Sequence, residues 1–114
     1  MEIRNRERDA PPFTTKDGST IREYLYTERQ SLAEASLPPG GSTQRHYHAR
    51  SEEIYVLLEG SGLVELDGEE RDVEAGDAVL IPPGAWHQIG AGPAGVRFLC
   101  CCAPPYSDED TFFT

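Results

Sequence analysis

Residues 40–53 read Gly40-Gly41-Ser42-Thr43-Gln44-Arg45-His46-Tyr47-His48-Ala49-Arg50-Ser51-Glu52-Glu53. Side chains alternate between the two faces of a β-strand, so His46 and His48 point the same way if this stretch is extended. A turn over residues 49–51 then brings Glu53 to the start of the next strand. Two imidazoles and one carboxylate would converge on a point, and these groups bind divalent metals. The stretch therefore predicts β structure that carries most of a metal site.

The third histidine of the chain lies in a second segment. Residues 76–87 read Gly76-Asp77-Ala78-Val79-Leu80-Ile81-Pro82-Pro83-Gly84-Ala85-Trp86-His87. The short apolar run before the prolines is typical of a strand, and the Pro-Pro-Gly sequence ends it in a loop that positions His87. The chain has three histidines, and all of them lie in these two segments.

These two segments resemble the two sequence motifs of the cupin family. The first motif is matched by Gly40, His46, His48, Glu53 and Gly60. The second motif is matched by Gly76, Pro82, Gly84 and His87. The family usually carries an asparagine four residues after that last histidine, where this chain has Ala91. This departure leaves the matched histidines and the glutamate unchanged.

The resemblance implies both a fold and a ligand set. Cupins are double-stranded β-helix, or jelly-roll, barrels, so we expect an all-β fold in a single domain. The resemblance also implies one divalent metal ion per chain, held by His46, His48, Glu53 and His87. Imidazole and carboxylate together suit Fe, Mn, Ni, Zn, Co or Cu and do not select one of them.

The turn residues along the chain independently predict an all-β fold. Glycine, proline and aspartate recur between short β-prone runs, and no long segment has the helical period. The expected strands are residues 13–15, 20–26, 31–37, 46–48, 54–59, 62–67, 69–74, 78–81, 86–90 and 96–102. From this pattern alone, a sandwich and a barrel both stay open.

A chain of 114 residues suits one domain with one hydrophobic core. The first twelve residues are charged and end in two prolines, so we expect an extended N-terminal arm over residues 1–12. The barrel is expected over residues 13–105. An acidic C-terminal tail is expected over residues 106–114.

The chain carries 20 acidic and 10 basic residues, and its formal net charge is −10. Nucleic acids and anionic membranes attract positive surfaces, so we expect neither as a partner. No apolar run reaches the roughly 18 residues that a membrane-spanning helix needs. The charged start of the chain lacks the apolar core of a secretory signal, and we therefore expect a cytoplasmic location.

Three consecutive cysteines, Cys100 to Cys102, lie in the last expected strand. An odd number of cysteines without a distant partner does not indicate a disulfide framework. We interpret them as small buried residues of a core strand. The alternative is that Cys100 and Cys102, which share a face, contact a ligand or a soft metal.

Strand alternation predicts which side chains line the site. Gln44 shares a face with the two histidines of the first segment, and Tyr55 shares a face with Glu53. These two side chains are therefore the candidates for polar, catalytic contacts with a substrate. The same alternation places Arg45 and Arg97 outside the barrel.

We expect a metal-dependent enzyme that acts on a small oxygen-bearing metabolite in an oxygenase-type or isomerase-type reaction. Four protein ligands leave coordination positions open for substrate, and metal cupins include dioxygenases, isomerases and lyases. The alternative is a non-catalytic cupin that binds a small molecule or senses a metal. We also expect a homodimer, because small cupins are commonly dimers and Ile54, Val56 and Leu58 would form an apolar outer face.

Overall fold

Two long strands form the centre of the fold. The computed structural model describes residues 1–114, and in it β5 (Glu52–Leu66) and β8 (His87–Ala103) pair antiparallel over nearly their full lengths. The sequence suggested two shorter strands in each of these regions. Each region is instead one continuous strand, because glycines let the chain bend without ending the pairing.

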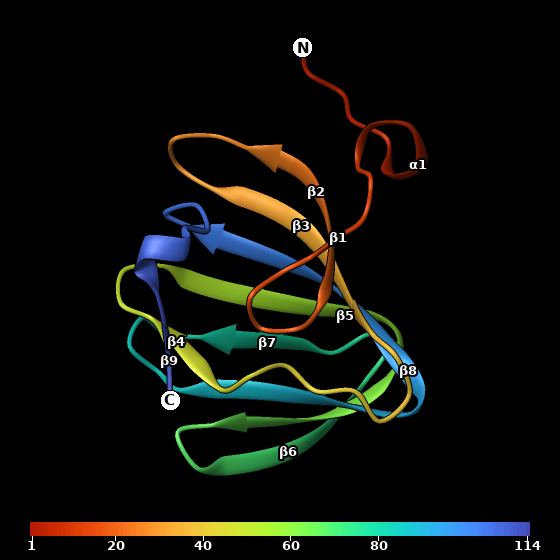
Figure 1. The fold of residues 1–114 in the computed structure, drawn as a ribbon, viewed down its shortest axis with the longest axis vertical. Coiled ribbons are helices and arrows are strands. Elements are labelled where there is room, and N and C mark those ends of the chain that lie inside the picture. Colours follow the sequence, from red (N-terminus) through yellow and green to blue (C-terminus); the bar gives the residue numbers. More distant parts are fainter.

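The other elements are α1 (Arg6–Asp9), β1 (Phe13–Thr14), β2 (Thr20–Tyr26), β3 (Ser31–Leu37), β4 (His46–His48), β6 (Glu69–Glu74), β7 (Ala78–Ile81), a 3₁₀ turn (Asp108–Asp110) and β9 (Thr111–Phe113). The strands run in the order β1-β2-β3-β8-β4-β9, and β5 pairs with β6, β7 and β8. Figure 1 shows the sheet curled on itself into a barrel. This arrangement confirms the expected all-β jelly roll. No helix is long and apolar enough to span a membrane.

The bend in β5 lies at Gly60, whose φ is +79°. The register against β8 shifts on both sides of it, between Leu57 and Glu59 and between Gly60 and Gly62. A Cβ atom at Gly60 would lie 2.1 Å from the carbonyl oxygen of Gly95, so only glycine fits there. The bulges increase the local twist and allow one strand to continue around the barrel.

Side chains alternate strictly along the first half of β5. Glu53, Tyr55 and Leu57 point inward and are buried, whereas the aliphatic side chains between them are exposed. Phe98 of β8 is fully buried in the same interior. Burial of such an apolar side chain contributes about 1.5–3 kcal/mol to stability. The packing that stabilises the barrel therefore also fixes the direction in which Glu53 points.

The sequence suggested an extended N-terminal arm, but part of the arm is helical. Residues Arg6–Asp9 form a helical turn, because the side chain of Asn5 accepts hydrogen bonds from two following backbone N–H groups. Arg6 then pairs with Glu34 of β3, which is 2% exposed and also accepts a hydrogen bond from Arg97. This ion-pair network holds the arm against the outside of the barrel.

Residues 106–114, expected as an acidic tail, carry regular structure. Their three consecutive acids form the 3₁₀ turn, and β9 follows it directly. β9 pairs antiparallel with β4 and places Thr111 opposite His48. The sequence did not indicate this strand, because β9 is only three residues long and follows a run of acidic residues. Its pairing with β4 stabilises it. The C-terminal segment therefore borders the histidine pair.

Candidate metal centre

Strand pairing brings the three histidines together. His46 lies opposite His87 in the pairing of β4 with β8, and their ring centroids are 4.2 Å apart. His48 follows two residues later on the same face of β4, with its centroid 5.4 Å from that of His87. One nitrogen from each ring lies within 4.8 Å of the others, and all three side chains are buried. The three rings can thus hold one metal ion.

Hydrogen bonds determine which nitrogen of each ring faces inward. Nδ1 of His46 lies 2.7 Å from the carbonyl oxygen of Gln44, and Nδ1 of His87 lies 3.0 Å from that of Ala85. A carbonyl oxygen only accepts, so both Nδ1 atoms carry the proton. Each Nε2 atom therefore keeps a lone pair for a metal.

The hydroxyl of Thr111 fixes His48 in the same way. This hydroxyl donates to the carbonyl oxygen of Ser107 at 2.8 Å, so it accepts from Nδ1 of His48 at 3.1 Å. The Nε2 lone pair of His48 then points towards the other two rings. Three identical tautomers, each held by an acceptor outside the cluster, form a preorganised set of donors.

Glu53 completes the cluster with an oxygen atom. Its Oε1 lies 3.4 Å from Nε2 of His48 and 3.4 Å from Nε2 of His87. Both Oε1 of Glu53 and Nε2 of His87 are buried and have no hydrogen-bond partner. Buried electron-pair donors without a partner are unfavourable by about 1–3 kcal/mol each. A cation between these atoms would satisfy both, so the residues present fit a divalent metal ion.

Two of the three pKa shifts in the cluster, those of Glu53 and His46, favour the forms that bind a metal. Burial disfavours the charged carboxylate of Glu53, but His48 and His87 outweigh this and hold its pKa well below the usual range. Burial, and then the neighbouring His87, lower the pKa of His46. Burial also opposes charge on His48, but the contact with Glu53 raises its pKa above the ordinary value. A metal would displace the proton that Glu53 helps to hold on His48.

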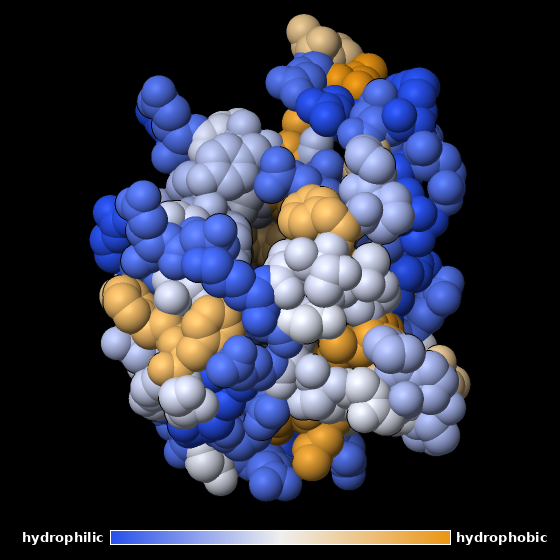
Figure 2. Space-filling model, viewed as in Figure 1, coloured by the Kyte–Doolittle hydropathy of each residue, from blue (hydrophilic) through white to orange (hydrophobic).

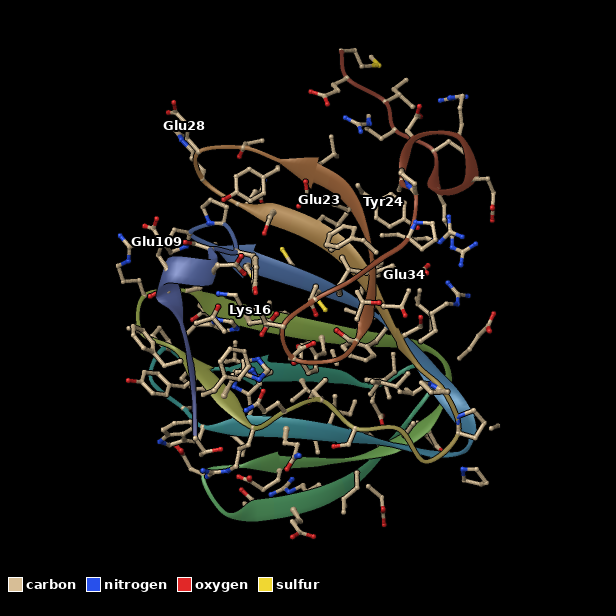
Figure 3. All side chains as sticks on the ribbon, viewed as in Figure 1. Lys16, Glu23, Tyr24, Glu28, Glu34 and Glu109 are labelled. Carbon is tan, nitrogen blue, oxygen red and sulfur yellow. The ribbon has the colours of Figure 1, made fainter.

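The cluster opens into a cavity of about 410 Å³. Figure 2 shows this face of the molecule hollowed near its centre, with apolar side chains at the rim. Figure 3 shows Lys16 on the loop that crosses in front of the barrel and Glu23 on β2, and both residues line the cavity. A cavity of this size accommodates a small metabolite.

The two polar candidates from the sequence behave differently. Tyr55 lines the cavity, is 3% exposed, and has a hydroxyl without a hydrogen-bond partner in the protein. The side chain of Gln44 is exposed and does not line the cavity, so its expected polar contact was wrong. Strand alternation failed there because β4 begins only at His46. Gln44 contributes its backbone carbonyl instead, and Thr43 lines the cavity.

The other expectations about side-chain direction agree with the structure. Cys100 and Cys102 are inward-facing residues of β8 and line the cavity. Arg45 is paired with Glu65 outside the cavity and lies over the ring of Trp86. Arg97 likewise forms an ion pair with Glu34, the partner of Arg6 in α1, and does not line the cavity.

Lys16 and Tyr106 are among the lining residues that sequence reasoning missed. Lys16 is the chain's only lysine and the only cationic lining residue apart from the histidines. Its turn was recognisable from Asp17-Gly18, but nothing local shows that this turn faces the site. Tyr106 also lines the cavity, with its ring centroid 5.8 Å from that of His48. No sequence signal indicated it, because its position depends on the path of the C-terminal segment.

The comparisons with known proteins agree with this geometry. A family model described as Cupin domain matches residues 33–102. Protein MJ1618 of Methanocaldococcus jannaschii, which is uncharacterized, is 50% identical over 106 residues, or 88% of this chain and 85% of that protein. Dimethylsulfoniopropionate lyase DddW of Ruegeria pomeroyi is 43% identical over 67 residues, or 59% of this chain and 43% of the lyase.

An oxalate-binding protein of Thermotoga maritima is 32% identical over 79 residues, or 68% of this chain and 65% of that protein. Among solved structures, that of a Streptomyces PAC13 variant with uridine matches with a TM-score of 0.85 at 19% identity. The match covers 100% of this chain and 91% of the PAC13 chain. At that identity, the likeness shows a shared fold.

Proposed function

Since this chain belongs to the cupin family, we propose that it holds one divalent metal ion and uses it to transform a small oxygen-bearing metabolite. The proposed ligands are His46, His48, Glu53 and His87. The observation that carries the proposal is the pair of buried, unpartnered atoms, Oε1 of Glu53 and Nε2 of His87. Without a cation, that arrangement would be unfavourable.

A bound metal ion of this kind supplies Lewis-acid chemistry or, if it is redox-active, dioxygen activation. The ligand types leave Fe, Mn, Ni, Zn, Co and Cu as candidates. An oxygenase-type or an isomerase-type reaction suits such a centre. The lyase among the relatives supports an enzymatic role, although the shared segment is less than half of that protein.

Tyr55 is the side chain that we propose as proton donor. Burial, and to a lesser extent the charge of Glu53, raise the pKa of Tyr55 well above its ordinary value, so the hydroxyl keeps its proton at neutral pH. The ring is held by Phe98, at a centroid distance of 4.6 Å. The hydroxyl is therefore available to donate to an oxygen atom of a substrate in the cavity.

The second candidate function is ligand binding without turnover. The oxalate-binding protein among the relatives favours it. In this case the metal and Lys16 would hold an anionic ligand, and Tyr55 would serve only in packing. The two functions differ in one observable, since only the enzyme converts its ligand.

We further propose that the chain acts as a homodimer. Ile54, Val56 and Leu58 are exposed in a row on the outer face of β5, and Leu80 of β7, which lies opposite Ile54, is 54% exposed. A contiguous apolar face of this kind favours association of two copies. The cytoplasmic location expected from the sequence stays a prediction.

Elemental mass spectrometry of untagged protein, purified without chelator, tests the metal site. We expect about one metal ion per chain. Glu53→Ala should abolish metal retention, whereas Glu52→Ala should not, because Glu52 is the exposed neighbour on the opposite face of β5. Equal metal content in both variants would show that the ligand set is wrong.

Turnover is tested next with the metal-loaded protein. Small diketones, phenols and hydroxy acids are screened by oxygen consumption and by product analysis. Tyr55→Phe should keep the metal and lose turnover by roughly 10²–10⁴-fold, the range for removal of a general acid. Tight binding of a compound that the protein never converts would favour the binding function instead.

A further inference from the structure

Cys102 and Glu53 face each other across neighbouring strands. They are directly paired in the register of β8 with β5, and both side chains lie on the buried face. Sγ of Cys102 lies 3.2 Å from Oε2 of Glu53. An ionised carboxylate only accepts hydrogen bonds, so the thiol is the donor. The contact is shielded from solvent, since Cys102 is 2% exposed and Glu53 is 5% exposed.

The two oxygen atoms of Glu53 consequently have different surroundings. Oε2 accepts the hydrogen bond from Cys102, whereas Oε1 has no hydrogen-bond partner and faces the histidine nitrogens. A carboxylate with two free oxygens can bind a metal through one of them or through both. With Oε2 engaged by the thiol, only Oε1 is free to face the metal position.

The position of Cys102 is itself fixed on its other side. Ser31 of β3 is paired with Cys102 in the register of β3 with β8, so Ser31, Cys102 and Glu53 form a row across three strands. The Ser31 hydroxyl oxygen accepts the backbone N–H of Tyr106 at 2.9 Å. Cys102 therefore lies between Glu53 and a serine whose hydroxyl is held by the C-terminal segment.

We propose that Cys102 is a positioning residue that holds Glu53 as a single-oxygen ligand of the metal. The proposal rests on the metal site proposed above and adds a function for a residue outside the ligand set. A glutamate that binds through one oxygen occupies one coordination position instead of two. The position left free is then available to the substrate.

Binding of Co²⁺ to the metal-free protein tests this proposal, because the visible bands of Co²⁺ weaken as its coordination number rises. Cys102→Ala should lower the Co²⁺ affinity by about 10–100-fold, the usual effect of removing a partner of a metal ligand. It should also weaken the visible bands as Glu53 turns to bind through both oxygens. Cys102→Ser retains a donor and should stay closer to the unaltered protein.

Cys101→Ala is the matched control, since Cys101 is the next residue of the same strand and alternation places it on the opposite face. It should change neither the affinity nor the spectrum. A double-mutant cycle with Glu53→Gln then separates positioning from packing. If Cys102 acts through the carboxylate, Cys102→Ala should have no further effect in the Glu53→Gln background. An equal loss of affinity in both backgrounds would overturn the proposal.

The remaining outcomes are also decisive. If the unaltered protein binds Co²⁺ and Cys102→Ala leaves both affinity and spectrum unchanged, this inference fails while the metal site stands. If the unaltered protein binds no Co²⁺, Mn²⁺ or Ni²⁺, the metal site fails and the inference fails with it. If Cys102→Ala does not fold, Cys102→Thr and Cys102→Val are compared instead. Their side chains have the same shape, but only threonine can donate a hydrogen bond, so Cys102→Thr should bind Co²⁺ more tightly. Equal Co²⁺ affinities of that pair would overturn the inference.

Discussion

The hydroxyl oxygen of Thr111 lies 3.1 Å from Nδ1 of His48 and so links the last strand to the candidate metal centre. Thr111→Val keeps the shape of the side chain and removes the acceptor. We expect metal affinity to fall by about 10–100-fold, because the ring loses the contact that fixes its tautomer and orientation. The stability of the metal-free protein should fall by about 1 kcal/mol. Competition with a chelator and thermal unfolding measure the two effects.

Thr20→Val is a suitable control for this prediction, since Thr20 is an exposed threonine of β2. It should leave the metal affinity unchanged. If Thr111→Val binds metal as tightly as the unaltered protein, the C-terminal segment supports the barrel without influencing the metal centre.

We expect the protein to lose stability in acid when Asp110 becomes protonated. It is buried, and its carboxylate accepts the backbone N–H groups of Arg50 and Ser51, in the turn between His48 and Glu53. Burial opposes ionisation, but these N–H groups outweigh it and lower the pKa of Asp110 below its ordinary value of 3.8. Its stabilising contribution is therefore full above about pH 4 and is lost as the pH falls through the lowered pKa of the folded state.

Chemical denaturation between pH 2.5 and 7, a range that includes the ordinary pKa of aspartate, measures this effect. Asp110→Asn should be less stable at pH 7 by about 1.5–3 kcal/mol, because it replaces a charged acceptor with a neutral one. Its stability should also depend less steeply on pH below 4. Parallel pH curves for the two proteins would contradict the assignment.

Gly60→Ala should severely destabilise the fold. The substitution forces a Cβ into the carbonyl oxygen of Gly95 at a position where φ is already +79°. Backbone strain and the displaced strand together should lower the free energy of unfolding by at least about 3 kcal/mol. Gly68→Ala is the matched control, since Gly68 also has positive φ, +92°, but has open space around it. That control should lose only about 1–2 kcal/mol.

Val56→Asp tests the proposed dimer. It places a charge in the middle of the exposed apolar row on β5 and should give a monomer in light scattering at micromolar concentration. The mutant barrel should keep its metal, because Val56 points away from the cavity. Leu63→Asp changes an exposed leucine in the second half of β5 and should leave the mass unchanged. A monomeric mass for the unaltered protein would rule out this interface.

Much of the site could be predicted because side chains alternate regularly between the two faces of a β-strand. Two histidines separated by one residue share a face of any strand, and Tyr55 shares a face with Glu53 by the same rule. The rule fails outside regular strands. Gln44 lies before β4 begins, so its side chain turns outward although it is two residues from His46.

The remaining features depend on contacts between distant segments. Thr111 contacts His48 only because β9 pairs with β4. The Lys16 turn reaches the cavity only because β2 pairs with β3 and the backbone N–H of Gln44 donates to the carbonyl oxygen of Asp17. Neither strand pairing leaves a local pattern in the sequence. The contact of Cys102 with Glu53 is similar, since it requires the register of β5 against β8, which bulges near Gly60 alter.

The place of Lys16 has a practical consequence. As the chain's only lysine, it is, apart from the N-terminal amine, the one group that an amine-selective dye would modify. A fluorophore attached there would sit at the mouth of the cavity. Its emission would then respond to any molecule that enters, so a compound library can be searched optically before the chemical reaction is known.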